Sequence, residues 1–307
     1  MDDAKQHLLY QAQALADQHR QAKLAEMEER AAREHADQQR RRLFAFINGP
    51  AEGESTVGFA PLDAAGEPAT HCGATCNGLL ADRSTQLAAV VCHPWGPLGG
   101  SLRDVCVSKV VAMLSDAGIT TLRFDFRTGI GRGHAAADDV RGACALLRSL
   151  DAPPRRLLLV GYSYGACVVA DVADAIPDVA AFAMLAPPLG ATVPLFLCRE
   201  VTRSAQASAK PKLVMVGEAD QFCSEQRFRV FAQAMAPPKR AHVVTDGASQ
   251  QCCSRESGCG HAHAKRVHHF NLFEYLDEYF RPWVAETFGV PFGELGTSSG
   301  DVALKSI

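Results

Sequence analysis

Apolar runs of strand length alternate along this chain with amphipathic runs of helix length, and turn residues separate them. Apolar strand-like runs occupy 87–92, 119–126, 155–162, 179–185, 212–217 and 241–246. Helix-like segments lie between them, with examples at 136–150, 164–176 and 271–284. Repeated strand–helix pairs predict an α/β fold whose mainly parallel central sheet carries helices on both faces, with function at the carboxyl ends of the strands. Shorter strand-like pieces in 43–86 are typical of an antiparallel edge.

The two ends of the chain differ from this core pattern. Residues 3–42 are rich in Ala, Gln, Glu, Lys and Arg and lack Gly and Pro, which predicts an N-terminal helical extension over 1–42. Its apolar stripe is thin, so we expect a solvated helix that packs partly on the domain or pairs weakly with a protein partner or a second copy. The α/β core is then expected to span 43–287. The polar, small residues of 288–307 predict a disordered tail.

Composition narrows the class of protein. With 307 residues and 47% hydrophobic residues, the chain can bury one large core. The net charge of −3 and the lack of a basic stripe argue against a nucleic-acid partner. The sequence shows neither a signal peptide nor an apolar run long enough to span a membrane. The chain has eleven cysteines, an odd number that does not suit the paired disulfides of a secreted protein. Several of them lie inside apolar strand or helix patterns, which favours a reducing, cytoplasmic location.

The strongest chemical signal is Gly-x-Ser-x-Gly at 161–165, set between a strand pattern and a helix pattern. Ser163 is then expected at the apex of a sharp turn, with its hydroxyl lifted clear of the sheet. Gly161 and Gly165 supply the backbone freedom that such a turn requires. The helix that opens at Tyr164 points its N–H groups at the place where an oxyanion would form. Ser163 is therefore the candidate nucleophile, and the alternative is an ordinary glycine-rich turn.

A nucleophilic serine needs an orienting carboxylate and a base in the order Ser…Asp…His. The strand 212–217 ends in a turn with Glu218 and Asp220. Asp220 is preferred because it lies at the tip of the loop, whereas Glu218 directly follows the turn glycine and is expected in solvent. Asp220 could also cap a helix from residue 222 onward.

Four histidines compete for the role of base. They are His261, His263, His268 and His269. The base is expected on the loop between the last strand and the last helix, and the helical pattern starts directly after His269. His269 is therefore the preferred base, and His268 is the alternative. If the segment is only an exposed histidine-rich loop, none of the four histidines acts as a base.

The loop after strand 87–92 completes the candidate site. It reads HPWGPLGGS at 93–101 and precedes an amphipathic helix that Ser101 could cap. A loop in this position supplies the second oxyanion donor. Pro94 has no N–H, so Trp95 is the expected donor. The alternative is a tight loop in which His93 packs structurally.

Taken in order, the pieces HPWGPLGGS, TLRFDFRTGIGRG, GYSYGA, LAPPL, VGEAD and HHF resemble the small α/β-hydrolases of the bacterial esterase-like type. The resemblance covers about residues 87–285. It implies the α/β-hydrolase fold, with Ser163 as nucleophile, Asp220 as acid and His269 as base. It also implies that Trp95 and Tyr164 are the oxyanion donors.

Two departures from the family pattern are visible. Trp95 and Gly96 replace the second His-Pro pair of the family loop, and Thr128 replaces the glycine after Phe-Arg, so substrate preference is open.

The chain also inserts a Cys- and His-rich segment at 246–267. Tetrahedral zinc uses such ligands, here Cys252, Cys253, Cys259, His261 and His263, with Cys72 and Cys76 as further donors if their loop lies near. The spacing fits no known zinc motif, so a polar loop without metal or other cofactor is favoured.

The expected function is that of a serine hydrolase, carboxylesterase-like, that cleaves a small ester, thioester or amide through an acyl-enzyme. The connection at 190–210 has room for about one helix, which predicts a minimal lid and an open cleft for a small-molecule acyl substrate. Two alternatives remain: a binding or scaffold protein that has lost catalysis, and a serine peptidase of the same fold.

Overall fold

Eight strands form a single sheet in the second of two compact units of the chain, Met1–Ala45 and Phe46–Ile307. The computed structural model describes residues 53–69, 75–127, 134–190, 200–246 and 266–292, together with the helical residues 21, 23 and 27. The rest of the predicted extension 1–42, residues 293–307 of the predicted tail and residues 247–265 of the Cys- and His-rich segment lie outside the described residues.

The sheet is antiparallel at one edge and parallel elsewhere. Its strands are β1 (Ser55–Phe59), β2 (Cys76–Ala81), β3 (Leu87–Cys92), β4 (Thr120–Phe124), β5 (Arg156–Tyr162), β6 (Val179–Leu185), β7 (Lys212–Gly217) and β8 (Lys239–Val244). Their spatial order is β1-β2-β4-β3-β5-β6-β7-β8. The strand β2 pairs antiparallel with both β1 and β4, and every later pair is parallel. The predicted edge and parallel core are therefore confirmed.

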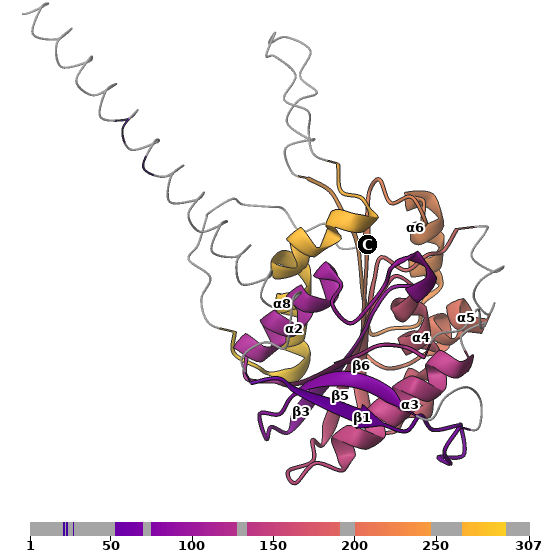
Figure 1. Ribbon diagram of the computed structural model, residues 1–307. Coiled ribbons are helices and arrows are strands. Elements are labelled where there is room, and N and C mark those ends of the chain that lie inside the picture. Colours follow the sequence, from indigo (N-terminus) through magenta and orange to yellow (C-terminus); the bar gives the residue numbers. More distant parts are fainter. Residues whose placement is uncertain are drawn as a thin grey trace, which may run out of the picture. The chain divides into compact units, whose positions relative to one another are not determined.

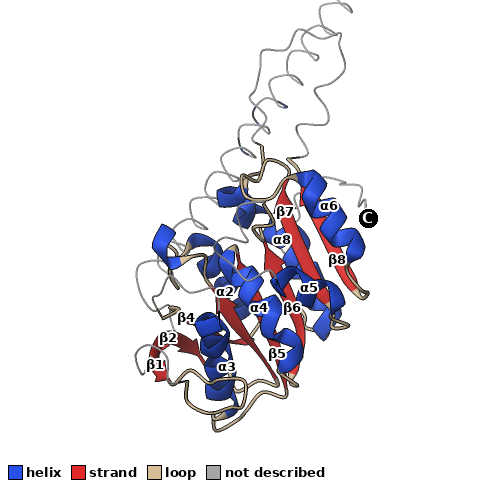
Figure 2. Ribbon diagram, turned by 90° about the vertical axis from the view of Figure 1, so that its right-hand side faces the viewer, coloured by secondary structure: helices blue, strands red, loops and turns tan. Residues whose placement is uncertain are grey.

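Helices cover both faces of this sheet. The described helices are α2 (Val105–Asp116), α3 (His134–Arg148), α4 (Tyr164–Val172), α5 (Glu200–Ala207), α6 (Glu225–Ala234) and α8 (Leu276–Phe288), with short 3-10 turns η1 (Gly96–Leu98), η2 (Ala173–Ala175) and η4 (His269–Tyr275). Figure 1 shows α2 and α8 together on one side of the sheet and α3 to α6 on the other. In Figure 2, turned by 90°, α3, α4 and α6 run along one face.

The two faces build two separate apolar cores, and the strand sequences show why. Every residue of β3 is buried, yet its side chains alternate: Val90 belongs to the core under α3 and α4, and Val91 to the core under α2 and α8. Because both faces are covered, the central strands are continuous apolar runs and lack the polar alternation of a half-exposed strand.

A buried ion pair ties the first described segment to the middle of the sheet. The Nε and Nη2 atoms of Arg123, on β4, donate to the two carboxylate oxygens of Glu54 at 2.9 and 2.6 Å. The remaining arm of the guanidinium donates to the carbonyl oxygen of Leu102 and to Ser108 Oγ on α2. Both charged side chains are almost fully buried. Three elements that are distant in sequence thus meet at one guanidinium.

Two helix starts differ from the sequence-based expectation. The helix after the 93–101 loop is capped by Asp104, whose Oδ1 accepts the N–H groups of Cys106 and Val107, and not by Ser101. The helix after Asp220 begins at Glu225 with Ser224 as its cap. In each case a later capping side chain is available, and the intervening residues form a loop instead of an extra helical turn.

Candidate active site

Ser163 sits at the turn between β5 and α4, in a conformation that is unusual for a residue with a side chain. Its φ of 54° and ψ of −115° lie in a strained region. A Cβ on Gly161 would lie 2.2 Å from the carbonyl oxygen of Gly165, and one on Gly165 would lie 2.5 Å from that of Cys92. Only glycine fits at both positions, which explains the spacing around the serine.

His269 and Asp220 come together from two different loops. The Nδ1 atom of His269 is 2.9 Å from Oδ2 of Asp220, and both side chains are buried. The other carboxylate oxygen of Asp220 accepts the N–H groups of Phe222 and Cys223 at 2.8 and 2.9 Å. These bonds fix the carboxylate, and the carboxylate in turn orients the imidazole.

Backbone contacts bring the two loops into register. Ala219 donates its N–H to the carbonyl oxygen of Val267 at 2.8 Å, and a Cβ on Gly217 would lie 2.5 Å from that same oxygen. The hydroxyl of Tyr162, next to Ser163, donates to the carbonyl oxygen of His269 at 2.9 Å. The end of β7, the end of β5 and the histidine segment are thereby held in one cluster.

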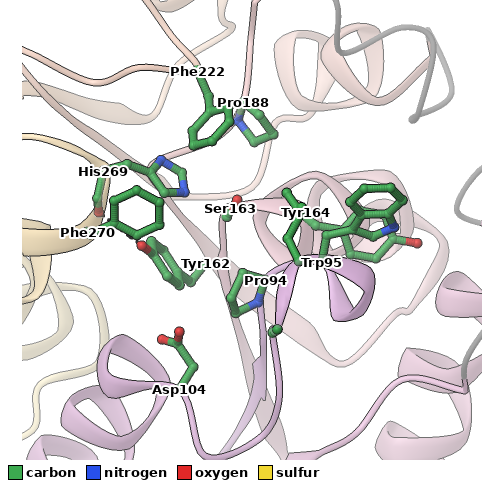
Figure 3. Close-up of a pocket in the computed structure, with 13 residues that line it drawn as sticks. Pro94, Trp95, Asp104, Tyr162, Ser163, Tyr164, Pro188, Phe222, His269 and Phe270 are labelled. Carbon is green, nitrogen blue, oxygen red and sulfur yellow. Dashed lines mark hydrogen bonds between the residues drawn. The ribbon is translucent and has the colours of Figure 1, made fainter.

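Aromatic rings surround the imidazole of His269. Tyr162 stacks on it with ring centroids 5.2 Å apart, while Phe222 and Phe270 meet it edge-on at 4.7 and 5.3 Å. Figure 3 shows the imidazole with one edge turned toward Ser163, on the opposite side of the serine from Tyr164 and Trp95. Burial of the Tyr162 hydroxyl raises its pKa, as do the nearby Cys106 thiol and the carboxylates of Asp104 and Asp220, so this hydroxyl stays a donor.

His93 holds the loop that carries Trp95. Its Nε2 accepts the N–H of Phe126 at 2.9 Å, so the proton lies on Nδ1, which donates to the carbonyl oxygen of Pro94 at 2.5 Å. Burial lowers the pKa of His93, which favours the neutral ring that this bond pattern needs. A Cβ on Gly100 would lie 2.1 Å from the same oxygen of Pro94, so the loop closes tightly on itself. His93 therefore has a structural role in this loop, and the loop also carries Trp95 to the cavity.

A cavity of about 590 Å³ opens over Ser163. It is lined by Pro94, Trp95, Leu98, Gly99, Gly100, Asp104, Tyr162, Ser163, Tyr164, Pro188, Phe222, His269 and Phe270. Three of these residues, Leu98, Phe222 and Phe270, are among the exposed large apolar side chains of the described chain. The cavity thus combines exposed apolar side chains with the polar groups of Ser163, His269 and Asp104.

Several solved structures resemble this chain in fold. No family model and no curated protein matches the sequence. The structure of XC6422 from Xanthomonas campestris, described as an a/b serine hydrolase without lid, aligns at a TM-score of 0.54 and 21% identity, over 80% of this chain and 99% of that one. The chain has the α/β-hydrolase fold.

Two esterases share the α/β-hydrolase fold with this chain at still lower identity. The Pyrococcus furiosus esterase Pf2001 aligns at a TM-score of 0.57 and 14% identity, over 77% of this chain and 92% of its own. Est1E from Butyrivibrio proteoclasticus aligns at 0.56 and 14%, over 76% and 100%. At such identity the likeness concerns the fold, whose architecture the sequence predicted.

The residues that the sequence singled out separate into two groups. Ser163, Trp95, Tyr164 and His269 line one cavity, and Asp220 is bonded to His269. His268 does not line the cavity and instead accepts the N–H of Phe270 at the start of η4. His261 and His263 lie outside the described residues.

Glu218 differs from its expected surroundings. Its Oε1 is buried and has no hydrogen-bond partner among the described residues, so the expectation of a solvated side chain was wrong. The carboxylate that contacts His269 is that of Asp220.

Several residues that line the cavity were not predicted from the sequence, chiefly Asp104, Phe222 and Phe270. Asp104 precedes an apolar helical run, which is a capping signal, but nothing in the sequence places it in the cavity. The two phenylalanines flank Asp220 and His269 closely in sequence, so proximity to those residues was the available signal.

The described residues contain neither a metal-ligand cluster nor a membrane-spanning helix. Within the described ranges, no group of three or more His, Cys, Asp or Glu side chains is placed to hold a metal ion, and Cys72, Cys252, Cys253 and Cys259 lie outside those ranges. Among the described helices, none combines the length and the hydropathy that crossing a membrane requires.

Proposed function

We propose that this protein is a serine hydrolase that cleaves a small ester, thioester or amide through an acyl-enzyme. The observation that carries the proposal is the 2.9 Å bond between His269 and Asp220, in which His269 shares one cavity with a serine held at a strained strand–helix turn. The fold shared with esterases supports it as an analogy.

In this mechanism His269 accepts the proton of Ser163 Oγ through Nε2 as the hydroxyl attacks the substrate carbonyl. Asp220 holds the proton on Nδ1 and stabilises the imidazolium that forms. The N–H groups of Trp95 and Tyr164 are the proposed donors to the oxyanion. His269 then protonates the leaving group, and a water molecule, activated by the same imidazole, releases the acyl group from Ser163.

Replacing the nucleophile is the first test. Ser163→Ala should lower kcat/KM for p-nitrophenyl butyrate by at least about 10³-fold and abolish labelling by a fluorophosphonate probe. Ser149→Ala, at an exposed serine outside the cavity, is the matched control and should keep both. Circular dichroism checks that each variant is folded. A wild type that neither turns over esters nor reacts with the probe would support the non-catalytic alternative.

The choice of base has its own test. His269→Gln should lower kcat by about 10³-fold or more, since the proton of Ser163 would have no acceptor. His268→Asn keeps a side-chain cap for η4 and should leave kcat within about threefold. A larger loss in the His268 variant than in the His269 variant would exchange the two roles.

A further inference from the structure

One carboxylate lines the candidate cavity without taking part in the mechanism above. Asp104 caps α2 through Oδ1, which accepts the N–H groups of Cys106 and Val107 at 2.8 and 3.4 Å. It also lines the cavity that contains Ser163 and His269. Figure 3 shows its carboxyl group turned into the cavity, toward Tyr162. The cap therefore leaves a charged group facing the space that a substrate would fill.

The other residues of the cavity compensate the charge of Asp104 only weakly. The described residues that line the cavity include neither lysine nor arginine, and Asp104 is their only carboxylate. Burial raises the pKa of Asp104, whereas the amides of Cys106 and Val107 and the imidazole of His269 lower it by smaller amounts. A partly buried carboxylate with weak compensation gains from a cationic ligand, because the ligand replaces the lost hydration.

The remaining walls suit an organic cation better than a hydrated metal ion. Five aromatic side chains line the same cavity: Trp95, Tyr162, Tyr164, Phe222 and Phe270. The face of an aromatic ring attracts ammonium groups, and the attraction is larger where water is excluded. Apolar walls around a single carboxylate match the chemistry of an alkylammonium group.

We propose that Asp104 is a specificity-determining residue that binds an organic ammonium group of the substrate. The proposal rests on the proposed function, because the bound group belongs to the ester, thioester or amide that Ser163 would attack. It also predicts that substrates with a carboxylate or phosphate at the same position are poor ones.

A pair of isosteric esters isolates the effect of charge. The 2-(trimethylammonio)ethyl and 3,3-dimethylbutyl esters of butyric acid differ in charge and hardly in shape. We expect the ratio of their kcat/KM values, cationic over neutral, to fall about tenfold in Asp104→Asn relative to the wild type. Asparagine caps helices as well as aspartate does, so the start of α2 is preserved.

Asp151→Asn is the matched control, because it removes one negative charge at an exposed position outside the cavity. It should leave the ratio unchanged. An equal fall in both variants would assign the effect to net charge and overturn the proposal. An unchanged ratio in Asp104→Asn, with the neutral ester still cleaved at Ser163, would overturn the proposal and leave the hydrolase function standing.

Calorimetry supplies a readout that does not need turnover. The wild type should bind 2-(trimethylammonio)ethanol at least about tenfold more tightly than 3,3-dimethyl-1-butanol, and Asp104→Asn should lose this preference. Equal binding of the two alcohols, or binding of neither, would overturn the proposal. If both esters resist hydrolysis and the fluorophosphonate probe fails to label Ser163, the hydrolase function fails, and the calorimetric preference still decides whether Asp104 binds ammonium.

Discussion

Asp220 and Glu218 lie two residues apart at the end of β7, yet their surroundings differ completely. Asp220 accepts two backbone N–H groups and contacts His269, whereas Glu218 has one buried oxygen without a hydrogen-bond partner in the described structure. Both are carboxylates in the same turn, so their chemistry cannot separate them. Only the contacts that each carboxylate makes in the folded chain separate them.

Replacing these two carboxylates should therefore give unequal results. Asp220→Asn should reduce kcat for p-nitrophenyl butyrate by about 10³- to 10⁴-fold, because an amide cannot stabilise the imidazolium of His269 and favours the wrong tautomer. Glu218→Gln is the matched control and should stay within about threefold. Steady-state kinetics decides, and losses of equal size would remove Asp220 from its proposed role.

Glycine at position 161 offers a prediction about folding. In Gly161→Ala the new methyl carbon would lie 2.2 Å from the carbonyl oxygen of Gly165 and 2.4 Å from the N atom of Ala166, so the turn that holds Ser163 must shift. We expect the free energy of unfolding to drop by about 3 kcal/mol or more.

The matched control for this position is Gly58→Ala on the edge strand β1. Its methyl group would first meet the side-chain methyl of Thr75 at 3.1 Å, which can turn away, so the change should stay below about 1 kcal/mol. Denaturant titration measures both variants. Equal stabilities would mean that the turn at Ser163 is more adaptable than its packing indicates.

Among the secondary-structure elements, β4 shows how the antiparallel edge is fastened to the parallel core. Arg123 on this strand joins Glu54, the residue before β1, to the 102–108 segment that leads into α2. Removing one partner of a buried pair leaves the other charge without compensation, which costs more than the pair itself contributes.

We therefore expect Glu54→Gln to lower the free energy of unfolding by about 3 kcal/mol. Arg148 and Asp178 form an ion pair that is much more exposed, so Asp178→Asn should cost less than about 1 kcal/mol. Thermal or urea unfolding monitored by circular dichroism compares them. A loss in Glu54→Gln no larger than that in Asp178→Asn would show that the buried pair adds nothing to the attachment of β1.

Some secondary-structure elements could be predicted from the sequence, and others could not. The central strands and the turn at 161–165 were predictable because their signals are local: an apolar run, a flanking glycine and a helical pattern. The start of α2 could not be predicted from the sequence, because Ser101 and Asp104 are both good N-cap residues. Only packing in the folded chain selects Asp104. The selection of Asp104 as the cap of α2 also places this residue at the cavity, and no single segment of the sequence encodes that placement.

For the molecule as a whole, the cavity belongs to one compact unit. All of its described lining residues lie within Phe46–Ile307, the larger of the two units. We expect a chain beginning at Phe46 to keep the kcat/KM of the full protein for p-nitrophenyl butyrate within about twofold and its Tm within about 3 °C. Differential scanning calorimetry and steady-state kinetics measure the two quantities, and a large loss in either would assign the first 45 residues a part in the folded hydrolase unit.

The 93–101 loop also gives the molecule a built-in optical reporter. The chain has two tryptophans: Trp95 borders the cavity, and Trp283 is buried in the core beneath α8. Emission from the buried Trp283 should stay constant when a ligand enters the cavity. The indole of Trp95 should then contact the ligand in place of water. A blue shift in fluorescence would then follow occupancy of the native protein in real time, with no dye attached.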